Sequence, residues 1–214
     1  MHVNDSKTQL LCISGNLDNR INSYIRIDGS TEIMGGSEMK LLGFWFGRRP
    51  NADIHVEKIC SKFRSRLWAL RHLQRAGMGE DDLKKIYQVV IRPVLDFASP
   101  TYHPLLSKTQ TVQLEALQKR ASKIIFGVHS SYSNIIESGK LELLAERRRG
   151  LCLNFAHKAA RNTNFGPRWF PERPISRYNT RRPDIYQENR AKTERMKKNP
   201  LSYMRHELNK DDKH

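Results

Sequence analysis

The chain has 214 residues, of which 38% are hydrophobic, and its 38 Lys and Arg against 22 Asp and Glu give a formal net charge of +16. That length is enough for a hydrophobic core and one or two domains. No apolar run approaches the roughly 20 residues of a membrane-spanning helix, so a helical membrane protein is excluded. The positive charge favours an anionic partner, either a phosphate backbone or a lipid surface. A basic protein with no such partner stays an alternative.

The positive charge is concentrated toward the C-terminus. Residues 1–50 carry 6 basic and 5 acidic side chains, whereas residues 151–214 carry 15 and 7. Three cysteines lie far apart without zinc or disulfide spacing, and no signal peptide is evident. We therefore expect an intracellular protein, nuclear or cytoplasmic, in a reducing compartment.

Residues 8–47 are predicted to form β structure. A short apolar strand is expected at 8–14, followed by a hairpin with a two-residue turn at Gly29-Ser30. A further apolar and aromatic run, residues 39–47, ends at Gly47 and Pro50. This small antiparallel sheet would be marginally stable alone.

Helical periodicity begins after Pro50. The first predicted helix starts near Asp53, ends near Gly77 and carries apolar residues three or four apart from Val56 to Leu73. The second starts near Glu80, and its predicted apolar face is made by Leu83, Ile86, Tyr87 and Val90, with Pro93 bending or breaking the helix.

Two more helices come after these. One is expected over residues 107–126, with Leu114, Leu117, Ala121 and Ile124 buried and Gly127 after its end. The other covers residues 141–161, and its predicted buried face is Leu144, Leu151, Phe155 and Ala159. Residues 162–214, rich in Pro and Arg, are expected to be an extended arm, disordered or loosely packed, with short helices near 187–209.

Five segments in this order resemble the C-terminal part of reverse transcriptases from non-LTR (LINE-type) retrotransposons. They are VNDSKTQ, KLLGFWFG, IYQVVIRPVLDFASPTYHP, LEALQKRASKIIFG and LLAERRRGLCLNFAHKAAR. The resemblance runs from Val3 to the end of the chain. It implies a palm remnant at 1–50, a helical thumb and extension at 51–161, and a basic arm at 162–214.

The resemblance also implies roles for single residues. VNDSKTQ is similar to the last palm motif, whose lysine, here Lys7, lies near the incoming triphosphate and can protonate the leaving pyrophosphate. KLLGFWFG is similar to the primer grip, which would place Leu42, Gly43 and Phe44 beside the primer backbone. The helices after Pro50 would hold the template–primer duplex.

The chain departs from the family at the metal site. The family holds two Mg²⁺ ions on aspartates upstream of VNDSKTQ, and these are missing here. The adjacent acids Glu80-Asp81-Asp82 lie at a helix start, and Asp211-Asp212 lie in a charged tail, so neither group is expected to bind metal. We expect no cofactor in this chain and no polymerase activity from it alone, with Lys7 as the nearest candidate for a catalytic residue.

Cations on the first helix are the main candidates for binding nucleic acid. One flank of its apolar face carries Lys58, Lys62 and Arg66. The other flank carries Arg64, Arg71 and Arg75. Several such residues could track a phosphate backbone. Alternatively, their stems cover apolar surface while the heads stay in water.

Other basic groups have open interpretations. Arg147-Arg148-Arg149 could form a patch or, more simply, point three ways from one helical turn. The mixture of arginines and aromatic residues in the arm, including Trp169 and Tyr186, is typical of single-strand or RNA binding but also of disorder.

The sequence thus predicts an α+β, mostly α protein with a palm-remnant sheet, a helical thumb and a basic tail. Its predicted function is that of a fragment of an RNA-directed DNA polymerase lacking catalytic aspartates and retaining a template–primer surface. The expected partners are RNA, DNA or an RNA–DNA duplex, no membrane, and the missing palm and fingers. The alternatives are a co-opted RNA- or DNA-binding module and a non-functional relic.

Overall fold

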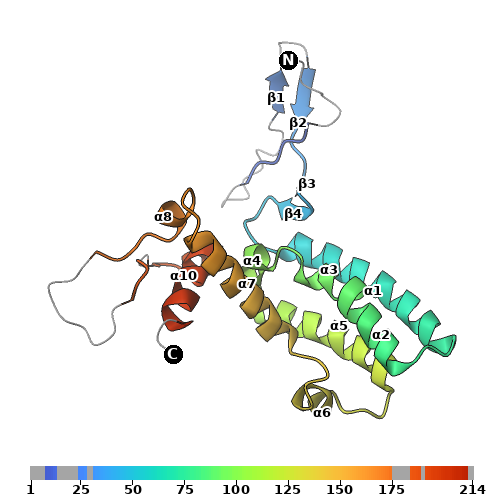
Figure 1. Ribbon diagram of the computed structural model, residues 1–214. Coiled ribbons are helices and arrows are strands. Elements are labelled where there is room, and N and C mark those ends of the chain that lie inside the picture. The colour runs from blue at the N-terminus through green and yellow to red at the C-terminus, as the bar shows by residue number, and fades with distance from the viewer. Residues whose placement is uncertain (1–7, 14–23, 28–30, 175–183, 189–190, 212–214) are drawn as a thin grey trace. The chain divides into compact units, whose positions relative to one another are not determined.

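The structure is a computed structural model that describes residues 8–13, 24–27, 31–174, 184–188 and 191–211. The chain forms two compact units, residues 1–62 and 63–214, which divide within one helix and are described separately. The predicted α+β, mostly α class is confirmed (Figure 1).

The elements follow one another as two hairpins and then helices. In chain order they are β1 (Tyr24–Ile27), β2 (Thr31–Met34), β3 (Glu38–Leu41), β4 (Phe44–Gly47), α1 (Asp53–Arg75), α2 (Glu80–Ile86), the π-helical turn η2 (Tyr87–Ile91), α3 (Pro93–Asp96), α4 (Ser99–Tyr102), the 3₁₀ turn η3 (His103–Leu105), α5 (Lys108–Phe126), α6 (Tyr132–Glu137), α7 (Leu144–Ala160), α8 (Gly166–Trp169), α9 (Glu194–Lys197) and α10 (Pro200–Asp211).

The predicted hairpin over residues 23–34 is present as β1 and β2, which pair antiparallel with Ile25 opposite Ile33. The predicted two-residue turn is wrong, because pairing of Ile27 with Thr31 leaves three residues, 28–30, between the strands. Those three residues lie outside the described part of the chain. The strand register pairs Ile25 with Ile33 on one face of the hairpin, and this register fixes the number of residues between the two strands.

The predicted strand at residues 8–14 is wrong for its described part. Residues 8–13 make one isolated bridge, in which Leu10 faces Gly35 and its carbonyl accepts from the Gly36 N–H at 2.8 Å. A ladder needs successive bonds on a neighbouring strand, and Ile13 is left 55% exposed. An apolar run alone does not make a strand without an edge to pair with.

The predicted run at residues 39–47 forms a second hairpin with β3 and β4, the arrangement that its resemblance to a primer-grip hairpin implies. Leu41 pairs with Phe44, so Leu42 and Gly43 alone form the turn. Both have positive φ, 49° and 87°, as a type I′ turn requires. Glycine adopts this conformation freely, but a leucine with positive φ is uncommon.

The β4 strand packs on the start of α1 within the first unit. Phe44 stacks on His55 with ring centroids 4.2 Å apart, and the Trp45 N–H donates to His55 Nδ1 at 3.4 Å. Burial lowers the pKa of His55 to about 4, so the ring is neutral near pH 7. A Cβ at Gly47 would lie 2.6 Å from the Cδ1 methyl group of Ile54, so a larger residue there requires that methyl group to move.

Burial along α1 follows the predicted period, with Phe63, Leu67 and Leu70 buried in the second unit. The helix after it departs from prediction, because Val90 is 50% exposed and Ile91 is buried instead. The cause is η2, in which the Arg92 N–H donates to the Tyr87 carbonyl at 2.8 Å, five residues back. The extra residue in this turn rotates the next side chains about the helix axis, just before Pro93.

The next predicted helix is confirmed as α5, with all four predicted apolar residues buried. Ser107 and Gln110 form a capping box at its start. The predicted face of α7 is wrong in part, because Leu151 is only half-buried and Phe155 is 40% exposed. The buried face instead runs through Leu144, Arg148, Cys152, Ala156 and Ala159.

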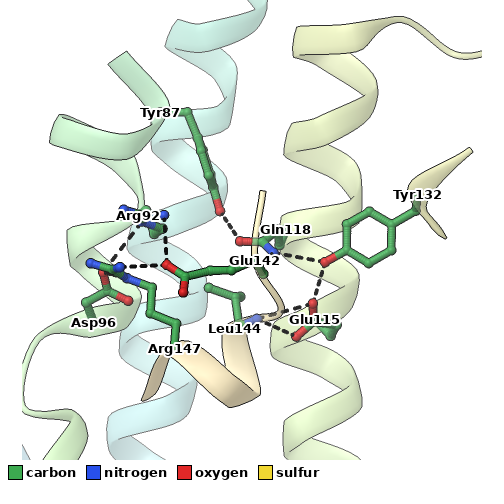
Figure 2. A network of polar contacts seen from close by, with 9 residues as sticks. All are labelled: Tyr87, Arg92, Asp96, Glu115, Gln118, Tyr132, Glu142, Leu144 and Arg147. Carbon is green, nitrogen blue, oxygen red and sulfur yellow. Dashed lines mark hydrogen bonds and ion pairs between the residues drawn. The ribbon is translucent and has the colours of Figure 1, made fainter. Parts of the chain in front are cut away.

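A polar network ties η2, α5, α6 and α7 together (Figure 2). The Tyr87 hydroxyl donates to Gln118 at 2.6 Å, and the Gln118 amide donates to Tyr132 at 2.9 Å and to the Glu142 carbonyl at 2.7 Å. The Glu115 carboxylate accepts from Tyr132 and from the Leu144 N–H at 3.1 Å. These bonds satisfy buried polar groups and place an anion at the N-terminus of α7.

The C-terminal region is more ordered than the predicted loose arm. A small core of Ala156, Ala159, Phe170, Met204 and Leu208 joins α7 to α10, and Figure 1 shows α10 lying against α7. The expected short helices are α9 and α10. Residues 175–183, which include Arg177, Arg181 and Arg182, lie outside the described part of the chain.

Candidate nucleic-acid interface

Three of the predicted cations form an exposed row on the second half of α1. Arg64, Arg71 and Arg75 are exposed, and no side-chain hydrogen bond or ion pair engages them among the described residues. At 3.6 residues per turn they fall within about 60° of one another, over roughly 16 Å of helix. Their charges are therefore available to a ligand.

An exposed tryptophan lies within this row. Trp68 is 65% exposed and is four residues after Arg64 and three before Arg71. Its ring contacts His72 edge-on, with centroids 3.9 Å apart. We call Arg64, Trp68, Arg71 and Arg75 the α1 stripe. Sequence reasoning missed Trp68, although its position between the two arginines on the non-apolar side of the helical wheel was the available signal.

Lys58 and Lys62, on the other predicted flank, lie in the first unit and differ from each other. Lys58 makes an ion pair with Glu38 at 2.9 Å and lies 4.6 Å from the centre of the Trp45 ring. It therefore links α1 to the β3–β4 hairpin through charge and cation–π contact. Lys62 is exposed, so it stays a candidate contact.

Arg66 has a structural partner. Its guanidinium Nη1 donates to the carbonyl of Val90, within η2. A π-helical turn before a proline disturbs the regular carbonyl pairing of the helix, and Arg66 satisfies one of the carbonyls involved. The structure thus separates Arg66 from the exposed stripe, although sequence spacing had grouped it with the candidate phosphate contacts.

The residues similar to a primer grip have different exposures. Leu42 is 90% exposed at the turn of the β3–β4 hairpin, and Gly43 follows it with φ 87°. Phe44 is only 7% exposed and stacks on His55, so its side chain supports the hairpin from inside. Leu42 and the backbone of Gly43 are the parts of this motif that a ligand could touch.

Several acidic residues that were considered as metal ligands make ion pairs in the structure. Glu80 pairs with Lys140 at 2.9 Å, and Asp82 pairs with Lys85 at 3.4 Å. Asp211 contacts His157, and Lys7 and Asp212 lie outside the described residues. Across residues 8–13, 24–27, 31–174, 184–188 and 191–211, no three His, Cys, Asp or Glu side chains are grouped as a metal site needs.

The three consecutive arginines of α7 point three ways, as expected. Arg147 donates to Asp96 and Glu142, at 2.7 Å each. Arg149 pairs with Glu207 of α10, and Arg148 is fully buried. Arg149 keeps more than half of its side-chain surface exposed, but the three arginines point apart and do not form one basic patch.

The aromatic residues of the C-terminal region also pack. Trp169 stacks on Phe165 with centroids 5.0 Å apart, and Tyr186 lies 6.0 Å from Phe170. Trp169 and Tyr186 are half-buried, whereas Phe165 is 49% exposed. These rings stabilise the α7–α10 region, so the α1 stripe presents the more available aromatic surface.

Comparison of the chain with protein families, with curated proteins and with solved structures finds no match in any of the three. None of the described helices is long and apolar enough to cross a membrane.

Proposed function

We propose that this chain binds nucleic acid, preferably a base-paired RNA–DNA or DNA duplex, through the α1 stripe. In this proposal it acts as the thumb of a reverse-transcriptase fragment. The observation that carries the proposal is the row of unengaged arginines around an exposed tryptophan on one long helix. The five segments that resemble non-LTR reverse transcriptases add support.

The chemistry of the stripe suits a phosphate backbone. Arginine presents a planar fork of N–H donors that matches phosphate oxygens. A duplex carries one negative charge per roughly 1.7 Å of axis, so a stripe of roughly 16 Å meets several phosphates. Trp68 can pack on a sugar of the same backbone. Lys62, Leu42 and Gly43 belong to the first unit, where each is a separate candidate contact.

The proposal assigns no polymerisation to this chain alone. We derive no step through the two Mg²⁺ ions of the parent family. In this proposal the palm and fingers that the resemblance implies act as a partner of this chain. A co-opted binding module would use the same stripe without that partner, and a relic would not bind at all.

A titration tests the proposal. A labelled RNA–DNA duplex is titrated with the wild-type chain at several salt concentrations, and the experiment is repeated with the triple variant Arg64→Gln, Arg71→Gln and Arg75→Gln. We expect the triple variant to bind more than about tenfold more weakly and to lower the salt slope by about 2 to 3, because each phosphate contact contributes about 0.9 to that slope.

The matched control removes the same charge elsewhere. Lys119, Arg120 and Lys123 are exposed on α5, and their replacement by glutamine lowers the net charge equally. This control should bind nearly as well as wild type. Equal losses in both triple variants would show that net charge alone drives binding, and no salt-sensitive binding in the wild type would refute the proposal.

A further inference from the structure

A stack of two aromatic rings lies at the C-terminal end of α7, where α8 begins (Figure 1). Phe165 lies on Trp169 with the ring centroids 5.0 Å apart and the ring planes 23° apart. Trp169 packs against the apolar core between α7 and α10, and its carbonyl accepts from Nε of Arg205 in α10 at 2.7 Å. Phe165 is 49% exposed. Because one face of Phe165 lies on Trp169, its exposed surface includes the other face.

The backbone between α7 and α8 fixes the position of Phe165. The Asn162 side-chain oxygen accepts from the Phe165 N–H at 3.2 Å, and the Asn162 carbonyl accepts from the Gly166 N–H at 2.8 Å. A Cβ on Gly166 would collide with the Ala160 carbonyl, so this turn packs directly on the end of α7. A ring whose backbone and one face are both fixed loses little conformational freedom when a ligand stacks on it.

Three cations near the stack have no partner among the described residues. Lys158, Arg161 and Arg168 are exposed, and their side chains make no hydrogen bond or ion pair there. Arg161 is four residues before Phe165 and Arg168 is three residues after it, so each is about one helical turn from the ring along the chain. Their charges are available to a ligand that contacts Phe165.

Few carboxylates compete for these cations. Residues 151–171 contain no Asp or Glu. Asp211 reaches this end of α7 from α10, and its carboxylate contacts His157 Nε2 at 3.0 Å. The helix dipole favours cations in the last turn of α7, but it accounts neither for Arg168 nor for an exposed aromatic ring. Free cations around an open ring are complementary to an anionic chain that carries flat rings.

We propose that Phe165, Trp169, Lys158, Arg161 and Arg168 form a binding site for single-stranded RNA or DNA. We call these five residues the α8 platform. An unpaired base stacks on the open face of Phe165, and the cations contact phosphates on either side of that base. A duplex keeps its bases paired and stacked on one another, so it offers a free base face only at its ends. The α8 platform is separate from the α1 stripe and goes beyond the proposed function.

The test titrates the full chain against a labelled single-stranded oligothymidylate, which forms no internal base pairs. Phe165→Ala should weaken binding about tenfold, as expected when one base loses its aromatic partner. Phe165→Tyr keeps the ring and should bind nearly as well as wild type. The matched control is Phe97→Ala, which removes a 51% exposed ring outside the α8 platform. An equal loss in the control, or no loss in Phe165→Ala, would overturn the inference.

A charge variant tests the cations without disturbing the stacked rings. Replacement of Lys158, Arg161 and Arg168 by glutamine should lower the salt slope by about 2, because each phosphate contact on a single strand contributes about 0.7. The control with glutamine at exposed positions 119, 120 and 123 of α5 removes the same charge and should keep the wild-type slope. Equal changes in both variants would overturn the inference, since net charge would then account for binding.

The two proposals fail separately. The triple α1 variant should lose affinity for the duplex and keep its affinity for oligothymidylate, and Phe165→Ala should do the reverse. If the α1 variant loses oligothymidylate binding and Phe165→Ala keeps it, the single strand lies on the α1 stripe and this inference is overturned. Duplex binding with no binding of oligothymidylate would overturn it and leave the function of α1 intact. Binding of anionic lipid vesicles in place of oligothymidylate, through the same three cations, would overturn the choice of partner.

Discussion

The arginines of α1 and those of α7 have the same chemistry and opposite surroundings. Arg64, Arg71 and Arg75 are exposed on α1 without a described partner. On α7, Arg147 pairs with Asp96 and Arg149 pairs with Glu207. The first set can meet a ligand, and the second set holds the protein together.

The difference arises from what packs on each helix. The α1 stripe lies to one side of the buried residues Phe63, Leu67 and Leu70, and no other described element covers it. Arg147 and Arg149 of α7 instead face carboxylates of neighbouring helices, Asp96 of α3 and Glu207 of α10. A group of positive residues in a sequence therefore predicts a binding surface only where no carboxylate of the folded protein pairs with them.

Replacing one arginine from each set should give the largest contrast in stability. Arg147→Met leaves Asp96, which is 11% exposed, without its 2.7 Å partner and with only Arg92 at 3.7 Å, and should lower the free energy of unfolding by about 2 kcal/mol. Arg71→Met removes an exposed charge and should change stability by less than about 0.5 kcal/mol. Urea unfolding followed by circular dichroism measures both. Similar values for the two variants would remove the distinction between the regions.

Local signals in the sequence predicted α5 well. Ser107 and Gln110 supply its capping box, and its apolar residues recur at the helical period. The start of α1 near Asp53 was likewise predictable from its polar first turn and its preceding proline. These features act within a few residues of chain, so sequence alone carries them.

Features set by distant contacts were not predictable. The π-helical turn η2 buries Ile91 and exposes Val90. The Val90 carbonyl accepts a hydrogen bond from Arg66, which belongs to α1. The buried face of α7 includes Arg148, which a hydrophobic pattern assigns to solvent. The candidate site was predictable in part. Helical spacing predicted the exposed arginines of α1, whereas the hydrogen bond that removes Arg66 from the candidate contacts and the exposure of Trp68 depend on the tertiary structure.

Acid should test the burial of His103, in η3, next; His55 of α1 has a similarly lowered pKa, so His103→Gln should remove only part of the pH dependence. Burial, with Arg148 as the second cause, lowers the pKa of His103 from its ordinary value of 6.5 to about 4. Between these pH values the unfolded chain binds a proton that the folded chain does not. The stability that His103 contributes is therefore full above pH 6.5 and is lost as pH falls toward 4, by about 2 kcal/mol between pH 6.5 and 5.

The measurement compares urea unfolding at about pH 7 and about pH 5 for wild type and His103→Gln, whose smaller pH dependence isolates this group. His129 is exposed, and His129→Gln should keep the pH dependence of wild type. An unchanged pH dependence in His103→Gln would show that His103 is not the group responsible.

Within α7, Arg148 should behave unlike its two neighbours. Arg148→Met removes a buried cation whose three side-chain nitrogens have no described hydrogen-bond partner, and methionine fills a similar apolar volume. We expect stability to rise by about 1 kcal/mol, seen as a higher urea midpoint with an unchanged slope. A loss above about 2 kcal/mol would mean that the guanidinium is stabilised where it lies.

The smallest expected effect concerns Trp68 and tests whether the α1 stripe does more than attract phosphates. Trp68→Ala should weaken duplex binding by about 1 kcal/mol, as loss of a stacked ring does, and Trp68→Phe should restore part of that loss. Neither change should affect stability appreciably, because the side chain is 65% exposed. The salt slope should stay that of wild type, since no charge is lost. An altered slope would mean that Trp68 acts by positioning the arginines beside it, and unchanged affinity would leave phosphate attraction as the whole contribution of the stripe.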